Sequence, residues 1–235
     1  MQFEKISAPS LKDLFVRQLR DAILSGELPI GTQLPVEREL ARQMQVSRAV
    51  VNGGLSQLAA DGFLEVRPRQ GTFVADYRRN GNMNTLIAIM EFRGGTMAKG
   101  EIRAILEVRR ALEHLAAGLA IEYASAEDMA RLAAIVDELA QAGDIPQATG
   151  IAFRFQHELA FVSGNSILPL IYYSFRAPVM TLWARYCRKH GVDTLYHNTA
   201  RLFEHIRARD KAGADAWIDS YLNDAIQGNR QIYVE

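Results

Sequence analysis

Five arginines in the first third of the chain have the side chains with the most specific binding chemistry: Arg38, Arg42, Arg48, Arg67 and Arg69. The planar guanidinium fork of arginine matches a phosphate group or the O6 and N7 edge of guanine. Residues 1–77 hold nine Lys/Arg and nine Asp/Glu, so this region has no overall positive charge. Contact with phosphates therefore requires these arginines to converge on one face. For Arg67 and Arg69, a role as solvated surface charges fits equally well.

Enzyme chemistry finds little support in the sequence. None of the five histidines follows a glutamate by three residues, as a di-iron carboxylate bundle requires, and no phosphate-binding loop, nucleophile elbow or HExxH motif occurs. The single cysteine, Cys187, excludes a disulfide within the chain and fits a reducing compartment. We see no secretory signal and no apolar run long enough to span a bilayer. The expectation is a cytoplasmic protein that is not an enzyme and has no membrane partner.

Short helices and a hairpin must position the arginines. A helical pattern begins near Ser10 and is closed by Gly26; a second helix opens at Pro35; a third is capped by Ser47 and runs to about Ala60. Two β-rich runs, FLEVR and TFVAD, then flank the turn PRQG. Helix, short turn, helix and hairpin predict a winged helix-turn-helix over residues 1–77.

The rest of the chain is predicted to be helical. Residues 78–98 are expected to form a linker with a short apolar helix. Helical patterns then cover 99–123, 126–141, 146–162, 167–189, 194–209 and 211–231, separated by short breaks. The fold class is therefore mostly α: an N-terminal winged helix-turn-helix with a small β-hairpin, then an antiparallel all-α bundle of about six helices over residues 99–235.

The stretch LRDAILSGELPIGTQLPVERELARQMQVSRAVVNGGLSQLAADGFLEVRPRQGTFVA resembles the DNA-binding domain of the GntR superfamily of bacterial regulators, without gaps over almost all of residues 10–75. Three later stretches, ILEVRRALEHLAAGLAIEYA, HELAFVSGNSILPLI and FEHIRARDKAGADAWIDSYL, more loosely resemble the FCD ligand-binding domain of the FadR-type branch. The resemblance implies a ligand-responsive transcriptional repressor that binds a palindromic operator as a homodimer. It also implies the DNA contacts, which would come from Arg38, Ser47, Arg48, Asn52, Arg69 and the wing-tip Gly71.

The segment Val51-Asn52-Gly53-Gly54-Leu55 departs from the family, which usually has V-R-E-A-L here. Asparagine pairs better with adenine than with guanine, so Asn52 predicts an altered operator. Gly54 fits a close-packing position, whereas the sequence gives no structural reason for Gly53. Two glycines weaken a helix by about 1–2 kcal/mol, so a merely tolerated weak helix and weakened DNA binding remain alternatives.

Many FCD domains bind a divalent metal through one aspartate and three histidines. The corresponding positions here are Phe153, His157, Thr199 and Tyr221, so only His157 is a good ligand, unless a shifted helix brings in His197. We therefore expect no metal and no other cofactor. FadR-type regulators that also lack the metal ligands can bind a long-chain acyl-CoA, and the resemblance extends to an acyl-thioester or a small carboxylate effector.

The candidate effector-binding residues combine one arginine with a histidine and several aromatic side chains. Arg109 falls where the family keeps a cavity-facing arginine, and a structural ion pair with a bundle glutamate is an equal alternative. The aromatic residues also fit a plain hydrophobic core. The other hypotheses for the chain are a helical interaction or ligand-binding module with weakened DNA binding, and a helical-bundle enzyme. The candidates are Arg109, His157, Tyr172, Trp183, Tyr186 and Tyr221.

Overall fold

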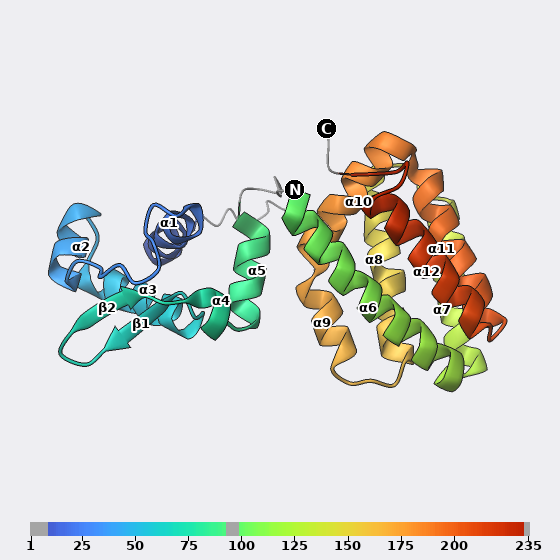
Figure 1. The fold of residues 1–235 in the computed structure, drawn as a ribbon, viewed down its shortest axis with the longest axis horizontal. Coiled ribbons are helices and arrows are strands. Elements are labelled where there is room, and N and C mark those ends of the chain that lie inside the picture. Colours follow the sequence, from blue (N-terminus) through green and yellow to red (C-terminus); the bar gives the residue numbers. More distant parts are fainter. Residues whose placement is uncertain (1–8, 93–98, 233–235) are drawn as a thin grey trace, which may run out of the picture. The chain divides into compact units, whose positions relative to one another are not determined.

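The computed structural model describes residues 9–92 and 99–232 and divides the chain into two compact units, Met1–Phe92 and Arg93–Glu235 (Figure 1). The first unit contains helices α1 to α5 and a two-stranded sheet, and the second contains helices α6 to α12. The chain is thus mostly helical, as predicted. Within the described residues, no helix has the length and apolar character needed to cross a membrane.

The first three helices begin and end where local signals predict. Helix α1, Leu11–Ser25, is opened by a capping box in which the Ser10 side chain accepts a hydrogen bond from the Asp13 backbone N–H, and it ends at Gly26 with a φ of 85°. Helix α2, Glu37–Gln43, is followed by a short turn and by α3, Arg48–Ala60. The helix-turn-helix arrangement is therefore confirmed.

A two-stranded antiparallel hairpin follows α3. Strand β1, Leu64–Arg67, pairs with β2, Gly71–Val74, in a register that joins Leu64 to Val74 and Arg67 to Gly71. The turn places Pro68 before Arg69, whose φ is 63°. This geometry fits a tight turn in which proline fixes the first φ and the next residue takes the left-handed conformation. The hairpin forms the predicted wing.

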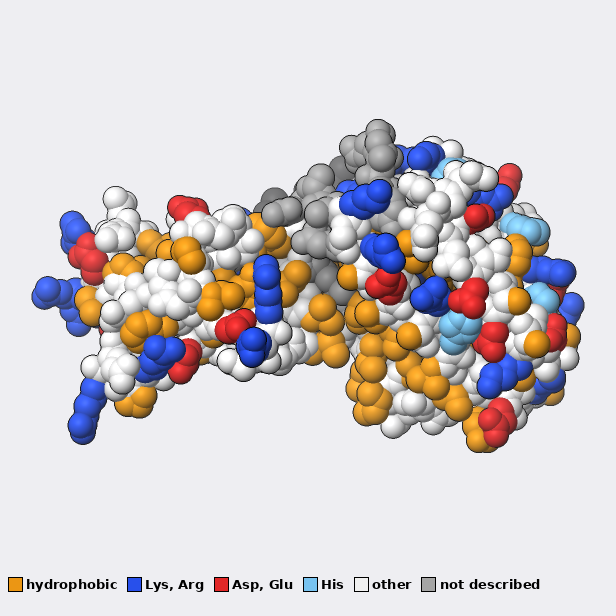
Figure 2. Space-filling model, viewed as in Figure 1, with side chains coloured by type: hydrophobic (Ala, Val, Ile, Leu, Met, Phe, Trp, Pro, Cys, Tyr) orange, Lys and Arg blue, Asp and Glu red, His pale blue; other side chains and the backbone are white. Residues whose placement is uncertain are grey.

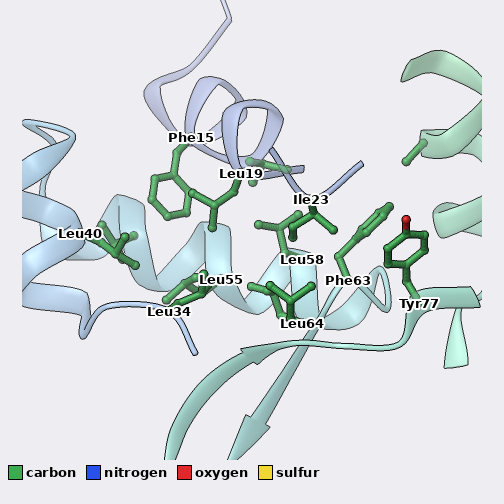
Figure 3. Packing of buried hydrophobic residues seen from close by; sticks show 14 residues of the cluster. Phe15, Leu19, Ile23, Leu34, Leu40, Leu55, Leu58, Phe63, Leu64 and Tyr77 are labelled. Atoms are coloured by element: carbon green, nitrogen blue, oxygen red, sulfur yellow. The ribbon is translucent and has the colours of Figure 1, made fainter. Parts of the chain in front are cut away.

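One hydrophobic core holds the first unit together (Figure 3). Phe15, Leu19 and Ile23 project from α1 toward the buried face of α3, and Phe63 and Leu64 approach from the start of the hairpin. Leu58 of α3 and Phe63 are completely buried. Burial of these apolar side chains fixes α3 against α1 and thereby determines which face of α3 remains exposed.

The predicted linker is largely part of the first unit. Helices α4, Tyr77–Asn80, and α5, Met83–Glu91, lie on its side of the division at Phe92. Asn82 donates a side-chain hydrogen bond to the Ala60 carbonyl at 2.7 Å, and the Thr85 hydroxyl donates to the Asp61 carbonyl. These bonds fasten α5 to the end of α3; residues 93–98 of the expected linker over 78–98 lie outside the described residues.

The second unit is a helical bundle. Helix α6 packs against α8 and α12, and α7 packs against α8 and α11. Fully buried side chains such as Phe155, Leu159 and Leu202 form its interior. The helices are α6 Lys99–Tyr123, α7 Ala126–Ala140, α8 Ile145–Val162, α9 Leu168–Ser174, α10 Arg176–His190, α11 Val192–Arg207 and α12 Lys211–Ile226.

The single helix predicted over 167–189 is two helices, α9 and α10, which meet at Phe175. Pro178 explains the break. Proline has no backbone N–H to bond to the carbonyl of Ser174 four residues earlier, so it is best placed in the first turn of a new helix. The described residues therefore contain seven bundle helices where the sequence predicted about six.

Arg209 fixes the end of α6. It lies in the turn between α11 and α12 with a φ of 57°, and its guanidinium donates hydrogen bonds to the carbonyls of Ala120 at 2.9 Å and Ile121 at 2.5 Å. The Ala120 carbonyl also accepts a hydrogen bond from the Ala124 backbone N–H, and a positive charge at the C-terminal end of a helix interacts favourably with the helix dipole. Arg209 thereby anchors the helix that carries Arg109.

Candidate DNA-binding surface and ligand cavity

Helix α3 has one face in the core and one face exposed. Val51, Leu55 and Leu58 are buried, whereas Arg48 and Asn52 are exposed. The Ser47 side chain caps the helix by accepting a hydrogen bond from the Val50 backbone N–H at 3.3 Å. The first turn of α3 therefore presents its remaining N–H groups, the positive end of the helix dipole and the Arg48 side chain together, which favours an anion such as phosphate.

Intramolecular pairing separates the five arginines into two groups. Arg42 forms an ion pair with Glu39 at 2.6 Å. Arg67 bonds to Glu65 at 2.9 Å and lies over the Phe73 ring at 4.4 Å. Among the described residues of the first unit, the other three, Arg38, Arg48 and Arg69, have no ion-pair partner, and all three are exposed.

These unpaired arginines come from α2, from the start of α3 and from the wing turn. Figure 2 shows lysine and arginine side chains projecting from the end of the first unit where Figure 1 places α2 and the wing. Positive charge is thus concentrated locally in a region whose formal charges balance.

The wing turn is fixed by its own backbone and by one side chain. The Gln33 amide donates a hydrogen bond to the Gln70 carbonyl at 2.7 Å. Gly71 has a φ of 118°, and a Cβ there would lie 2.9 Å from Nε2 of Gln33. Glycine at this position therefore permits both the backbone conformation and the Gln33 contact. Arg69, which directly precedes Gln70 and Gly71, is held with its side chain exposed.

The two glycines of α3 differ in environment. Gly54 is buried, and a Cβ there would lie 2.3 Å from Cδ1 of Phe15, so this position requires close packing of α3 on α1. A Cβ at Gly53 would meet only the Lys12 side chain, at 3.4 Å, which is ordinary contact. Packing explains Gly54 and gives no reason for Gly53.

Two adjacent cavities lie inside the helical bundle. One, of about 30 Å³, is lined by side chains from α6, α8, α10, α11 and α12, including Arg109, Trp183, Tyr186 and Tyr221. The second, of about 10 Å³, is lined by Arg109, Tyr172 and Trp183. Arg109, Gln156 and Trp183 line both cavities, so we name them the first and second lobes of one site.

A buried carboxylate organises this site. Glu113 is completely buried, and the Arg109 Nε and the Tyr221 hydroxyl each donate a hydrogen bond to it. The Gln156 side chain lies beside the same carboxyl group. Burial raises the pKa of Glu113 above its usual value of 4.5, and the neighbouring Arg109 charge opposes that increase. Both alternatives for Arg109 are therefore found together: it forms an ion pair with a bundle glutamate, and it lines a cavity.

Several polar atoms in the site have no hydrogen-bond partner within the part of the chain that the structure describes. They are Oε1 of Gln156, Oδ1 of Asn198 and the hydroxyl of Tyr172. Gln156 and Asn198 are 5% and 8% exposed, and both line the first lobe. Tyr172 lines the second lobe; burial, together with the nearby Glu113 charge, raises the pKa of its hydroxyl well above 10, so the group remains protonated. A buried polar atom without a partner is unfavourable, so such atoms indicate where a ligand can bind.

Five of the six candidate effector residues line these lobes, and His157 does not. Its Nε2 lies 3.2 Å from the Pro169 carbonyl, and its ring packs against Phe153, Phe161 and Tyr173. The contact with the start of α9 turns the ring away from the site. Among the described residues, no group of three or more His, Cys, Asp and Glu side chains is arranged to hold a metal ion.

Sequence reasoning missed Glu113, Gln156 and Asn198. For Glu113 a signal existed: it follows Arg109 by four residues, the spacing at which helical side chains meet. Gln156 follows Ala152 and precedes Leu159 and Ala160 on the buried side of α8, and a polar residue among buried positions indicates a special environment. Asn198 had no comparable signal.

Two family models match the chain. The model for bacterial regulatory proteins of the gntR family matches residues 13–74, and the FCD domain model matches residues 104–224, more than half of the chain. The chain belongs to the GntR family of regulators with an FCD domain. The first match contains α3 and the wing, and the second contains every residue that lines the second lobe and all that line the first except Ala225 and Ile232.

Relatives that match most or about half of the chain are named as transcriptional regulators. The HTH-type transcriptional regulator LutR of Bacillus subtilis is 28% identical over 211 residues, which cover 86% of this chain and 93% of that protein. Mce2R of Mycobacterium tuberculosis is 36% identical over 109 residues, 46% of this chain and 45% of its own. This GntR-family chain is a transcriptional regulator with a DNA-binding domain; its named relatives are regulators and not enzymes.

A solved structure supports the fold. The Listeria monocytogenes protein Lar, described as controlling the expression of the agr system, is similar over 96% of this chain and 99% of its own, with a TM-score of 0.65 and 17% identity. At that identity the likeness shows the fold alone. The winged helix-turn-helix followed by a helical domain is thus an arrangement that this chain shares with a solved regulator.

Proposed function

We propose that this GntR-family chain is a cytoplasmic, FadR-type repressor that binds a palindromic operator as a homodimer and is controlled by a small-molecule effector in the FCD domain. The observation that carries the DNA-binding part is the set of exposed arginines without ion-pair partners on α2, α3 and the wing. Arg38, Arg48 and Arg69 would contact phosphates or guanine, and Ser47 and Gly71 would place the α3 N-terminus and the wing against the backbone.

Asn52 is the residue that would determine base preference. It is exposed on α3, one helical turn after Arg48, and its neighbours on this face, Ala49 and Ser56, are small and exposed. A helix with short side chains can approach base edges closely, and an asparagine amide can bond to N6 and N7 of adenine. The proposal is therefore an operator with an adenine at one fixed position of each half-site.

Selection of bound sequences from a random duplex library tests this proposal. The unaltered protein should enrich a palindrome, with half-sites about one helical turn apart. Asn52→Arg should change the preferred base at one position of each half-site from adenine to guanine and leave the other positions unchanged. Ser56→Ala, on the same face, serves as the control. Enrichment of no sequence would favour the alternative of an interaction module with weakened DNA binding.

Exposed apolar residues on the bundle support the homodimer. Val108 and Leu115 of α6 are 44% and 46% exposed, and Leu170 and Tyr173 of α9 are 65% and 61% exposed. Figure 2 shows hydrophobic side chains gathered over the part of the second unit where Figure 1 places these helices. Apolar patches of this kind mark interfaces between proteins.

The oligomeric state can be measured by light scattering coupled to size-exclusion chromatography. Leu170→Glu should convert a dimer to a monomer, because it would bury a charge in the interface. Tyr123→Glu changes an equally exposed residue at the end of α6 and should leave the dimer intact. A dimer unaffected by Leu170→Glu would place the interface elsewhere.

The bundle site supports control by an effector. Its lobes combine apolar walls with Arg109 and unpartnered polar atoms, the usual composition of a small-molecule site. Of the effector classes that the sequence suggests, a small ligand fits the first lobe of about 30 Å³ better than a long acyl chain, which would have to separate the helices. Tyr172, Trp183, Tyr186 and Tyr221 would form its walls. Binding would change the affinity for DNA by favouring one conformation of the dimer.

A further inference from the structure

The site in the bundle has an internal charge balance that restricts its ligand. Arg109 is the only Lys, Arg, His, Asp or Glu side chain among the described residues that line either lobe. Its charge is matched by Glu113, which is buried directly behind it and hydrogen-bonded to its Nε. The site therefore has no net charge, although Arg109 lines the lobes and Glu113 does not.

The hydrogen-bonding groups that remain are of both kinds. Only the Nε of Arg109 has a partner among the described residues, which leaves its two Nη groups as donors; the guanidinium lies 4.7 Å over the Trp183 ring and is held there. The Gln156 side chain lies beside Glu113, and its Oε1 is buried without a partner among the described residues. An arginine N–H and an amide oxygen therefore border the same two lobes.

The two groups must lie close together. Arg109 and Gln156 both line the two lobes, and Arg109 donates its Nε–H to Glu113, so the free Nη groups of Arg109 and the Gln156 side chain border the same small space. Asn198 adds a second unpartnered oxygen in the first lobe, and its Nδ2 donates to the Tyr186 hydroxyl at 3.2 Å. The complementary ligand presents an acceptor to Arg109 and a neighbouring donor to Gln156.

A carboxylate fits only half of this arrangement. Its two oxygens could accept hydrogen bonds from Arg109, but it has no donor for Gln156 or Asn198, and it would bring a negative charge beside Glu113, whose charge Arg109 already balances. A primary carboxamide places a C=O and an NH₂ side by side without a charge, and a pair of neighbouring hydroxyl groups does the same.

We propose that the FCD-domain site of this chain binds a small uncharged ligand with an adjacent acceptor and donor, a carboxamide or a polyol, in preference to the corresponding carboxylate. This inference rests on the proposed function, since it names the chemical class of the effector. It replaces the small carboxylate and acyl-CoA classes expected from the sequence.

Matched pairs of probes test the charge preference on the full chain. Lactamide is compared with sodium lactate and succinamide with sodium succinate, at pH 7.5 and equal ionic strength, with glycerol as the polyol. Titration calorimetry and thermal denaturation give the affinity and the stabilisation that binding causes. At least one amide or glycerol should bind, and each amide that binds should do so about tenfold or more tightly than its acid, the difference expected for one additional buried hydrogen bond.

Two variants locate the binding. Gln156→Leu should abolish amide binding. Asn198→Leu, which does not touch Glu113, should weaken amide binding and provides the test if Gln156→Leu does not fold. Gln141→Leu, at an exposed position on the second unit, is the matched control and should bind as the unaltered chain does. Circular dichroism of each variant checks its folding.

Three results would overturn the proposal. They are a carboxylate that binds as tightly as its amide or more tightly, amide binding that persists in both Gln156→Leu and Asn198→Leu, and a failure of every uncharged probe to bind. The same protein is tested with the DNA sequence selected from the random library. If it binds that DNA and none of the uncharged probes, the ligand class is wrong and the regulator function stands. If it selects no DNA, the proposed function fails whatever the cavity binds.

Discussion

Gly54→Ala is expected to destabilise the first unit even though alanine is the better helix former. A Cβ at this position would lie 2.3 Å from Cδ1 and 2.7 Å from Cε1 of Phe15. Phe15 is 2% exposed and surrounded by the core (Figure 3), so its ring cannot shift without moving its neighbours. Overpacking of a core costs about 1–3 kcal/mol, and the gain in helix propensity is about 1 kcal/mol. The contacts are severe, so the free energy of unfolding should fall by about 1–2 kcal/mol.

Gly53→Ala is the matched control, with the opposite expected sign. It lies one residue earlier in the same helix, is half-buried, and would place its Cβ 3.4 Å from the Lys12 side chain and near no other non-local atom. Lys12 is exposed and its flexible chain can move. The substitution should therefore raise the free energy of unfolding by about 0.5–1 kcal/mol.

The assay must report on the first unit alone. Both tryptophans, Trp183 and Trp217, belong to the second unit, so their fluorescence should show the same denaturation midpoint in both variants and the unaltered chain. Hydrogen exchange of the α3 amides, measured by mass spectrometry, reports the stability of the first unit. Stabilisation by Gly54→Ala equal to that by Gly53→Ala would refute the packing argument. Combining Gly54→Ala with Phe15→Leu should recover part of the loss, because the smaller side chain makes room.

Three further outcomes are expected. Arg48→Ala should weaken operator binding by about 1–3 kcal/mol in an anisotropy titration, whereas Arg42→Ala should weaken it less because Glu39 already pairs with Arg42. Dialysis against EDTA should leave the melting temperature unchanged. Burial lowers the pKa of His114, but its hydrogen bonds with Asp215 and Asp219 outweigh burial and raise it above 6.5. The resulting stabilisation is complete below about pH 6.5 and is lost as the pH rises through the raised pKa, so denaturation midpoints should fall over that range and fall less in Asp215→Asn.

The helices of the first unit were predictable because their ends carry local signals. Ser47 caps α3 and Gly26 closes α1, and both signals lie within three residues of the helix end they fix. The packing of α5 was not predictable in this way. It depends on Asn82 and Thr85 bonding to Ala60 and Asp61, more than twenty residues away in sequence. A polar segment with a short apolar helix has the same composition whether or not it docks.

The sequence also predicted only part of the candidate site in the bundle. The aromatic residues were correctly expected inside, since Tyr172, Trp183 and Tyr186 are 5–6% exposed. The break between α9 and α10 was missed because the apolar period continues through it. Two other polar residues of the site were missed for a different reason: Gln156 and Asn198 belong to residue types that are usually exposed. Only the meeting of helices shows that they are buried, each with a side-chain oxygen that has no partner among the described residues.

The weak centre of α3 has two separate causes. Gly54 points inward, and the Phe15 ring alone accounts for it, so no hypothesis about DNA is needed there. Asn52 points outward and contributes nothing to the core. The presence of asparagine here, where the family usually has arginine, therefore alters the exposed surface of α3 and leaves its packing unchanged. A merely tolerated weak helix stays an alternative for Gly53, which packing does not explain. The packing therefore leaves α3 as an intact scaffold with a different exposed side chain at position 52, which supports the proposal that Asn52 alters the base preference.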